Sequence, residues 1–405
     1  MFQHLTLQNL LSFGPEGVGV ELRPLNVLIG TNGAGKSNFI DAISLLEAAP
    51  QTPQSIGRPL FQGGGVAQWM WKGAGAGESC RLDAVLSGQT AHAKSLRYRV
   101  DFGSLNGRFN LIDEVVENEK PDSPHQSDVR FFYRFQNGRP VLNVRSSGQQ
   151  DWSATANDGR RLRQDLDLDP SQSILAQRAD PEQFPEISYL GSQFRRIAIY
   201  RNWGFGRHTP ARLPQQPDLP SEHLLPDAAN LALVLNYLDN FNEVRGEIRR
   251  RLREFNPQFD GFLARIDGGT VQLALQVSGL AEALPATRLS DGTLRYLALM
   301  CVLCHPKPPP VICLEEPEIG LHPDILPKVA EMLVQASANT QLIVTTHSDI
   351  LIDALSDTPE NVLVCESSEK GTQVRRLNAD ALKPWLTDYS LGALWTRGNL
   401  GGNRW

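Results

Sequence analysis

The first part of the chain alternates between apolar runs and one helical pattern. Residues 2–13 and 18–29 are rich in apolar side chains and predict strands. Residues 25–29 are almost all apolar, which is typical of a strand covered on both faces. Apolar residues then recur at helical spacing over 36–48. The predicted order is therefore strand, glycine-rich turn at Gly30, and helix.

The middle of the chain is less regular. Residues 50–77 are rich in Gly, Pro and Gln and predict a loop. Short alternating segments from 80 to 150 predict antiparallel strands. The remaining expectations are a polar, turn-rich stretch at 151–185, a helix or a helix running into a strand at 187–201, a Pro-rich linker or ordered loop at 207–226, a long helix at 228–255 and a strand at 270–277.

The last third alternates helices with short apolar strands. This alternation favours a mostly parallel sheet covered by helices. No sustained heptads occur, so we expect no long coiled-coil arm. Helices are predicted at 293–304, 323–336 and 349–356, and strands at 311–315, 341–346 and 361–365.

Composition narrows the class of protein. The 405 residues include 39 basic and 45 acidic side chains, a formal net charge of −6, which excludes a generally basic nucleic-acid binder. Five cysteines are too few for a disulfide framework. No signal peptide and no apolar run of ~20 residues is visible. We therefore expect a soluble cytoplasmic protein without a membrane partner.

The turn after the first buried strand carries a phosphate-binding pattern. Residues 30–37, GTNGAGKS, match GxxxxGK[ST] in full. Glycines let successive backbone N–H groups turn towards a phosphate, and the following helix points its positive end at the same anion. A Gly-rich turn that carries Lys-Ser by chance is the alternative. The candidate nucleotide-binding residues are Gly30, Asn32, Gly33, Ala34, Gly35, Lys36 and Ser37, and Ser37 is also a candidate Mg²⁺ ligand.

A second apolar strand, at 311–315, ends in carboxylates. Neighbouring residues of an extended strand point to opposite faces, so Glu315 and Glu316 cannot perform the same task. We assign Glu315 to the metal, directly or through water, and Glu316 to the base that orients the attacking water. An exposed acidic turn is the alternative interpretation of this segment.

Two weaker signals complete the set. His347 follows the strand at 341–346 and could donate to a terminal phosphate, although a lone His is more often structural. Residues 289–293, LSDGT, directly precede an apolar helix. Ser290 and Gly292 there could form a second anion site, but Ser-Asp-Gly is also an ordinary helix cap.

In this order the motifs resemble the ABC-type ATPase set: Walker A at 30–37, signature at 289–293, Walker B at 311–316 and the His switch at 347. Within that superfamily, the opening LTLQNLLSFGP is similar to the start of SMC- and RecF-type proteins. LEEPEIGLHP, TTHS and the ending SLGALWTRGNLGGNRW resemble predicted AAA-family ATPases grouped with the OLD (overcoming lysogenization defect) proteins. Residues 80–285 are poorly covered by the resemblance.

The resemblance implies an α/β fold: a P-loop NTPase head of the ABC type with a mixed parallel sheet, an antiparallel β subdomain and a helical inserted lobe. We expect one composite ATPase head made of three segments. These are an N-terminal ATP-binding lobe with Walker A at 1–115, an inserted β/helical lobe at 116–285, and a lobe with the signature, Walker B and His switch at 286–405.

The resemblance also implies ATP and Mg²⁺ as cofactors and a head-to-tail homodimer. Ser290 and Gly292 of one chain would then complete the site built on Lys36 of the other. The chain departs from transporters in its Glu-Glu acid pair and its LSDGT signature. Gln193 is the candidate for the Q-loop. The segment after His347 is too short for a Toprim domain, so we expect no nuclease activity.

Two arginine-rich stretches are candidates for contacts with DNA phosphates. A solvated helix face paired with Glu243 and Glu247 is the alternative. The arginines are Arg245, Arg249, Arg250, Arg251 and Arg253 in one stretch and Arg195, Arg196, Arg201, Arg207 and Arg212 in the other.

The resulting hypothesis is an ATPase that clamps and releases DNA or a partner protein, in genome maintenance or phage defence. One rival is an ATP-dependent scaffold that regulates a separately encoded effector with negligible turnover. Another is the ATPase subunit of a membrane transporter, which the RecF-like opening and the non-transporter signature disfavour.

Overall fold

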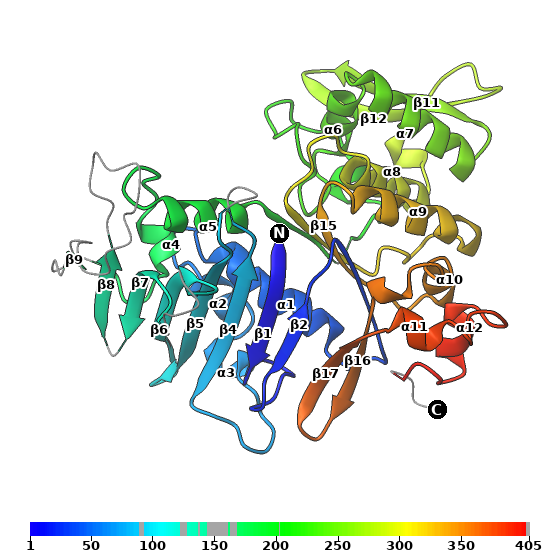
Figure 1. Ribbon diagram of the computed structural model, residues 1–405. Helices are drawn as coiled ribbons and strands as arrows, with labels where there is room; N and C mark the ends of the chain where they lie inside the picture. The colour runs from blue at the N-terminus through cyan, green and yellow to red at the C-terminus, as the bar shows by residue number, and fades with distance from the viewer. Residues whose placement is uncertain are drawn as a thin grey trace.

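The computed structural model describes residues 1–88, 93–121, 128–136, 138–143, 161–162, 168–201 and 203–401. Two large sheets and a small one organise the chain (Figure 1). The strands are β1 (Phe2–Gln8), β2 (Val18–Glu21), β3 (Leu25–Ile29), β4 (Ser79–Leu86), β5 (Leu96–Leu105), β6 (Arg108–Asn118), β7 (Phe131–Gln136), β8 (Arg139–Asn143), β9 (Arg161–Leu162), β10 (Ile197–Tyr200), β11 (Phe259–Asp267), β12 (Thr270–Val277), β13 (Leu284–Pro285), β14 (Val311–Glu315), β15 (Gln341–Thr345), β16 (Val362–Ser368) and β17 (Gly371–Arg376).

The central sheet has six strands in the order β10-β14-β15-β3-β16-β17. All neighbouring pairs are parallel except β16 and β17, which form an antiparallel hairpin. The predicted strands at 25–29, 311–315, 341–346 and 361–365 are all members of this sheet. The expectation of a mostly parallel sheet from the alternating last third is therefore confirmed.

The second sheet has eight strands in the order β2-β1-β4-β5-β6-β7-β8-β9, and its pairs are antiparallel. The described strands between 80 and 143 confirm the prediction of antiparallel strands in that region. Within the stretch expected to be polar and turn-rich at 151–185, residues 151–160 and 163–167 lie outside the described residues. The proposed domain boundary at residue 115 falls within β6, so the second sheet contains residues from both sides of it.

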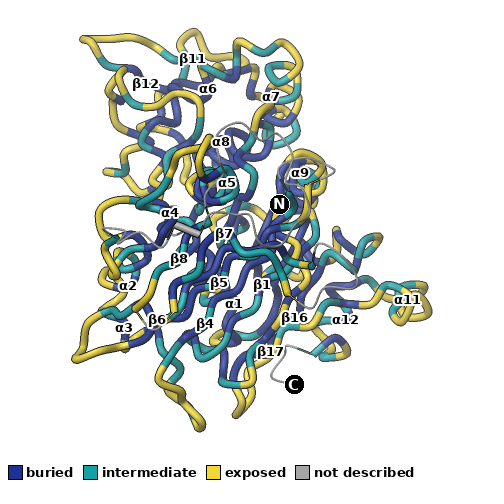
Figure 2. Tube along the Cα trace, turned by 60° about the vertical axis from the view of Figure 1, so that its left-hand side comes forward, coloured by how far each residue is buried: buried dark blue, intermediate teal, exposed yellow. Residues whose placement is uncertain are grey.

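Helices cover both faces of the central sheet. Figure 2 shows a largely buried interior through α1 and the strands, with exposed residues concentrated in outer loops. The helices are α1 (Lys36–Ala48), α2 (Gly57–Gln62), α3 (Val66–Trp69), α4 (Ile174–Gln177), α5 (Pro185–Arg195), α6 (Leu231–Leu238), α7 (Asn242–Phe255), α8 (Asp291–Leu303), α9 (Leu326–Ala336), α10 (Asp349–Asp353), α11 (Ala379–Leu382) and α12 (Leu391–Thr396).

Alternation along β3 divides the apolar core in two. Val27 and Ile29 pack with the cluster that contains α6, α8, α9, α10 and α12. Leu28, between them, packs with the cluster that contains α1, α5 and the antiparallel sheet. The alternation arises because successive side chains of a strand point to opposite faces. The almost entirely apolar strand predicted at 25–29 is therefore buried on both faces.

A lobe made of α6, α7 and β11–β13 extends above the central sheet (Figure 1). The long helix expected at 228–255 is instead two helices, α6 and α7, separated at 239–241. Asp239 and Asn240 favour this break, because short polar side chains compete with the helical backbone for hydrogen bonds. The Asp239 carbonyl accepts a hydrogen bond from Arg245 Nε at 2.7 Å, which fixes the turn between the two helices.

Among the described residues, no helix is both long enough and apolar enough to cross a lipid bilayer.

A buried carboxyl group connects the antiparallel sheet to α4. Glu114 of β6 is fully buried and accepts hydrogen bonds from Tyr98 Oη at 2.8 Å, Ser173 Oγ at 2.5 Å and the Ile174 N–H at 3.0 Å. Ser173 is also the N-cap of α4. Burial raises the pKa of Glu114 to about 7, although these hydrogen bonds oppose the shift.

The raised pKa of Glu114 predicts a pH-dependent stability. A carboxyl group that binds its proton more tightly in the folded state stabilises the fold fully below its unfolded pKa of 4.5. This contribution is lost as the pH rises through about 7. Glu114→Gln should therefore remove on the order of 3 kcal/mol of the pH dependence of the unfolding free energy between pH 5 and 8.

Urea unfolding at several pH values measures this difference. Glu78→Gln is the matched control, since Glu78 is exposed. If Glu114→Gln and the wild type keep the same dependence on pH, the buried carboxyl group does not titrate in this range.

Candidate functional site

Four parallel strands end at one edge of the central sheet. The in-register pairs Val27–Val344 and Leu314–Val344 place the carboxyl ends of β3, β14 and β15 side by side. The pair Tyr200–Leu314 adds β10 to the same edge. Glu315 is the last residue of β14, and the segments that leave the four strand ends begin with Gly30, Glu316, Thr346 and Arg201. Ligands of open parallel sheets bind at this edge, and it is therefore the candidate site.

The loop between β3 and α1 can be built only with glycine at its critical points. Gly30 and Gly35 have φ angles of 149° and 95°. A Cβ on Gly30 would lie 2.3 Å from the carbonyl oxygen of Cys365 in β16. Gly33 has a φ of 82°, and nothing lies within 4 Å of the position of its missing Cβ. The loop is therefore pressed against the sheet at Gly30 and open at Gly33.

Thr372 of β17 supports this loop from behind. Its hydroxyl, which is buried, lies 3.1 Å from the Ala34 carbonyl oxygen and 2.7 Å from Ser12 Oγ. A Cβ on Gly35 would come within 2.3 Å of Thr372 Oγ1. The glycine thus allows α1 to begin in contact with the β16–β17 hairpin, and the sequence pattern alone did not indicate this support.

Lys36 is the buried cation of the site. Its ammonium group donates to the carbonyl oxygens of Gly30 at 2.9 Å and Thr31 at 3.0 Å, across the mouth of its own loop. Burial lowers the pKa of Lys36, and the nearby carboxylates Glu315, Glu316 and Glu318 oppose this shift. The charge of Lys36 is therefore placed among the acids of the neighbouring strand ends.

The residues of the loop fit a polyphosphate. Asn32, Gly33 and Ser37 are exposed, while Ala34, Gly35 and Lys36 are buried. Open space at Gly33, the amino end of a 13-residue helix and a Lys already pointing into the loop are the elements of an anion cradle. The hydroxyl of Ser37 is accessible to a metal ion, and Glu315 supplies a carboxylate oxygen, the donor type that Mg²⁺ prefers.

Glu315 and Glu316 point to different neighbours. Glu315 Oε2 lies 3.9 Å from Arg201 Nε, on the side of β10 and α1. Glu316 has a φ of 46°, a backbone region that non-glycine residues rarely occupy, and its N–H donates to the Thr345 carbonyl at 3.0 Å. Its carboxylate lies 3.5 Å from His347 Nε2. The side chains of Glu315 and Glu316 therefore point apart, as expected for adjacent strand residues, and the backbone also turns at Glu316.

The surroundings of His347 favour its neutral imidazole. Burial lowers its pKa, Lys36 lowers it further, and Glu316 opposes the shift. His347 interacts with Lys36 and Glu316, and it therefore lies at the same edge of the sheet as the phosphate loop. A neutral imidazole can donate one hydrogen bond to an anion without adding a further cation.

Glu318 positions His347, although the sequence assigned it no role. Its Oε1 accepts from Thr346 Oγ1 at 2.7 Å and from the His347 N–H at 2.8 Å. Burial raises the pKa of Glu318, and both hydrogen bonds oppose the shift. The loop after β14 is therefore fastened to the end of β15.

The signature segment lies apart from the phosphate loop. Ser290 is exposed and caps α8, with its Oγ accepting from the Thr293 N–H at 3.0 Å. A Cβ on Gly292 would lie 2.6 Å from the Gly320 carbonyl oxygen, so the segment packs on the loop that follows Glu316. Within the described part of the chain, no hydrogen bond or ion pair joins Ser290 or Gly292 to the phosphate loop.

Several sequence-based interpretations of side chains need correction. Gln193 lies in α5, before the amino end of β10, so it is not at the carboxyl edge; Arg201 holds that position. Arg212 is not a surface arginine: it is buried and donates to the carbonyls of Phe205, Ala286 and Leu289 and to the Asp291 carboxylate.

The arginines of α7 do not form one free stripe. Arg251 is 1% exposed and pairs with Glu247 at 2.6 Å. Arg250 pairs with Glu247 and Glu254, and Arg245 with Asp239. Arg249 and Arg253 are exposed. The pairing with Glu247 agrees with the alternative of a solvated, salt-bridged face.

The chain is similar to known ATPase heads. A profile of the family described as "AAA domain, putative AbiEii toxin, Type IV TA system" matches residues 25–353. No curated protein matches the sequence.

Three solved structures of Smc heads are similar over nearly the whole chain. An Smc head bound to the C-winged helix domain of ScpA has a TM-score of 0.57 and 14% identity, covering 94% of this chain and 99% of that one. The Smc head of Pyrococcus furiosus with an extended coiled coil, bound to the C-terminal domain of ScpA, has a TM-score of 0.54, 13% identity and coverages of 96% and 98%. The Smc head of Pyrococcus yayanosii has a TM-score of 0.50, 10% identity and coverages of 96% and 99%. At these identities the likeness establishes the fold, which is the P-loop NTPase fold of Smc heads.

The contacts of Glu318 predict a selective effect of its truncation. Glu318→Ala leaves the buried Thr346 hydroxyl and the His347 N–H without their acceptor, and should lower the free energy of unfolding by about 1–3 kcal/mol. Glu318→Gln keeps an oxygen at the Oε1 position and should remain close to the wild type. Urea denaturation of both variants measures this. Equal losses in the two variants would show that the acceptor is not what stabilises this loop.

Proposed function

The chain belongs to the family described as "AAA domain, putative AbiEii toxin, Type IV TA system", and from this premise we propose that it binds ATP with Mg²⁺ and hydrolyses it. One observation carries the proposal. Lys36, Glu315, Glu316 and His347 meet at one edge of a parallel sheet, although they come from three separate stretches of the chain. An ATPase needs a cation, metal-binding oxygens and a base in such proximity.

Each group has a proposed task. The loop of Gly30, Asn32, Gly33, Ala34 and Gly35 would hold the β-phosphate, with the Ala34 N–H donating to the Thr31 carbonyl at 3.1 Å. Lys36 would bridge the β- and γ-phosphate oxygens. Ser37 and Glu315 hold Mg²⁺, which would neutralise charge that develops on the phosphate oxygens.

The proposed hydrolysis uses the two side chains that face each other after β14 and β15. Glu316 accepts the proton of a water molecule that attacks the γ-phosphorus, and the bond to the β–γ bridging oxygen breaks to leave ADP and phosphate. His347, whose pKa is lowered by burial and whose Nε2 lies 3.5 Å from the Glu316 carboxylate, donates to the γ-phosphate.

The proposed active form is a head-to-tail homodimer. Ser290 is exposed at the amino end of α8 and is not bonded to the phosphate loop of its own chain. Arg212 fixes the segment by three carbonyl contacts and one carboxylate contact, which pre-organises it for a ligand outside the chain. Ser290 and Gly292 would then face the nucleotide of the partner subunit.

Closure of this dimer is proposed to clamp a partner protein or DNA. The Smc head of one similar structure is bound to the C-winged helix domain of ScpA, which favours a partner protein. The family description names a toxin–antitoxin system, so a separately encoded effector is a natural partner in defence. The exposed Arg249 and Arg253 of α7 are candidates for contacts with DNA, and genome maintenance is the role that such contacts would favour.

Glu316→Gln should trap the closed dimer. The amide cannot accept the proton of the attacking water, so ATP turnover should fall more than about 100-fold while ATP stays bound. Light scattering should show a dimer with Mg²⁺ and ATP and a monomer with ADP, which is the control. A Glu316→Gln protein that stays monomeric at all accessible ATP concentrations contradicts the composite site.

Mixing two inactive variants tests whether the site is shared. Lys36→Ala should abolish nucleotide binding, and Ser290→Arg should disable only the partner's site that it faces while leaving each chain able to bind ATP. A heterodimer of the two has one site with an intact Lys36 and an intact Ser290. An equimolar mixture should therefore recover up to about a quarter of the wild-type turnover. No recovery, with Ser290→Arg still binding ATP, argues against sharing.

A further inference from the structure

Arg201 lies between two carboxylates at the metal side of the site. It follows β10 directly, and the pairing of Tyr200 with Leu314 puts it beside Glu315. Its Nη1 lies 2.5 Å from Asp41 Oδ1, and its Nε lies 3.9 Å from Glu315 Oε2. Asp41 is one helical turn after Ser37, so it lies on the same face of α1. One guanidinium therefore contacts a helix carboxylate and the proposed metal ligand.

The guanidinium is a cation with donor groups only. A cation this close to Glu315 opposes a second, divalent cation at the same carboxylate, because both compete for one negative charge. Its third nitrogen, Nη2, is buried and has no hydrogen-bond partner among the residues that the structure describes. The ion pairs therefore leave one buried donor of Arg201 for a group that enters the site.

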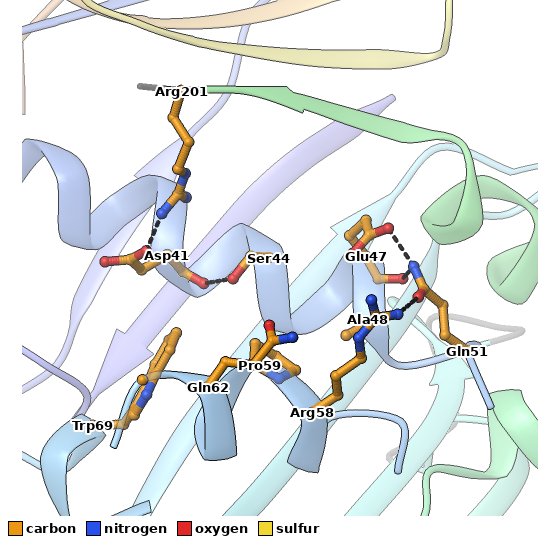
Figure 3. Close-up of a pocket in the computed structure, with 11 residues that line it drawn as sticks. Asp41, Ser44, Glu47, Ala48, Gln51, Arg58, Pro59, Gln62, Trp69 and Arg201 are labelled. Carbon is orange, nitrogen blue, oxygen red and sulfur yellow. Dashed lines mark hydrogen bonds and ion pairs between the residues drawn. The ribbon is translucent and has the colours of Figure 1, made fainter. Parts of the chain in front are cut away.

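Arg201 also has space to move. Asp41 and Arg201 line a pocket of about 490 Å³ between α1 and the α2–α3 segment. Figure 3 shows the two side chains pointing toward each other, with Trp69 on the opposite side of the pocket. The side chain of Arg201 is 29% exposed, so it can leave Glu315 without unpacking the core.

We propose that Arg201 is a positioning residue that occupies Asp41 and Glu315 as an internal counter-cation, so that Mg²⁺ binds at Glu315 only together with nucleotide phosphates. The inference rests on the proposed role of Glu315 as a metal ligand. Without nucleotide, Arg201 and Lys36 offset part of the negative charge of the carboxylates at the edge. A bound triphosphate would add negative charge at this edge, which favours binding of a metal ion. Its oxygens would also give Nη2 of Arg201 a hydrogen-bond acceptor.

The test is Mn²⁺ binding without nucleotide, followed by electron paramagnetic resonance. Arg201→Gln removes the competing charge and should bind Mn²⁺ at least about tenfold more tightly than the wild type. Arg201→Lys keeps the charge and should behave as the wild type, as should Arg196→Gln at the exposed end of α5. Adding Glu315→Gln to Arg201→Gln should abolish the gain, which excludes binding elsewhere.

The outcomes separate this inference from the proposed function. Wild-type protein that binds Mn²⁺ with a non-hydrolysable ATP analogue, beside an Arg201→Gln variant of unchanged nucleotide-free affinity, overturns the role of Arg201 alone. Thermal melting shows whether that variant is folded. If it is not folded, Asp41→Asn, which loses one of the two anchors of Arg201, is measured in its place. An unchanged nucleotide-free affinity of Asp41→Asn for Mn²⁺ then overturns the role of Arg201. Wild-type protein that binds no Mn²⁺ even with the analogue overturns both proposals.

Discussion

The parallel register of four strands is the constraint on which the candidate site depends. β3, β14, β15 and β10 pair in parallel, so their carboxyl ends open at one edge. Residues separated by as many as 317 positions in the sequence, from Gly30 to His347, meet there because both faces of these strands are buried in apolar cores. A shift of one residue would move each side chain from one core into the other, so the packing of both cores specifies the register.

Each charged group at this edge is held in place by a specific partner. Lys36 is held by the carbonyls of its own loop, and Arg201 by Asp41, while Glu318 is used to fasten the end of β15. A buried charge costs free energy unless it is paired or hydrogen-bonded, so each of these groups needs its partner. The arrangement leaves Glu316 and His347 facing each other at 3.5 Å. It also leaves the amides of the phosphate loop accessible at Gly33.

The sequence was sufficient where a local pattern has only one structural solution. The strand–glycine–helix order at 25–48 and the strand at 311–315 were predicted with nearly the observed bounds, because apolar runs and glycines specify them locally. The Glu315–Glu316 divergence also followed from strand geometry. The functional roles assigned to Glu315 and Glu316 also rest on local sequence patterns, and they remain predictions.

Contacts between distant segments were not predictable. Gln193 was chosen for its residue type, whereas Arg201 reaches the edge because β10 pairs with β14. Arg212 looked like one more surface arginine, and only the fold places it beneath the signature segment. Thr372 supports the phosphate loop from a hairpin more than 300 residues away. One sequence signal could have indicated Arg201: it directly follows an apolar strand, as the functional residues at the other three strand ends do.

The central claim is that one chain completes the nucleotide site of another, and cross-linking tests it most directly. Asn32→Cys in one tagged chain and Ser290→Cys in a second, differently tagged chain place thiols on two exposed positions, whereas four of the five native cysteines are buried. With a short bis-thiol linker, the account predicts a mixed cross-linked pair in the presence of Mg²⁺ and ATP and little without them. A yield of mixed pairs that does not respond to nucleotide would contradict it.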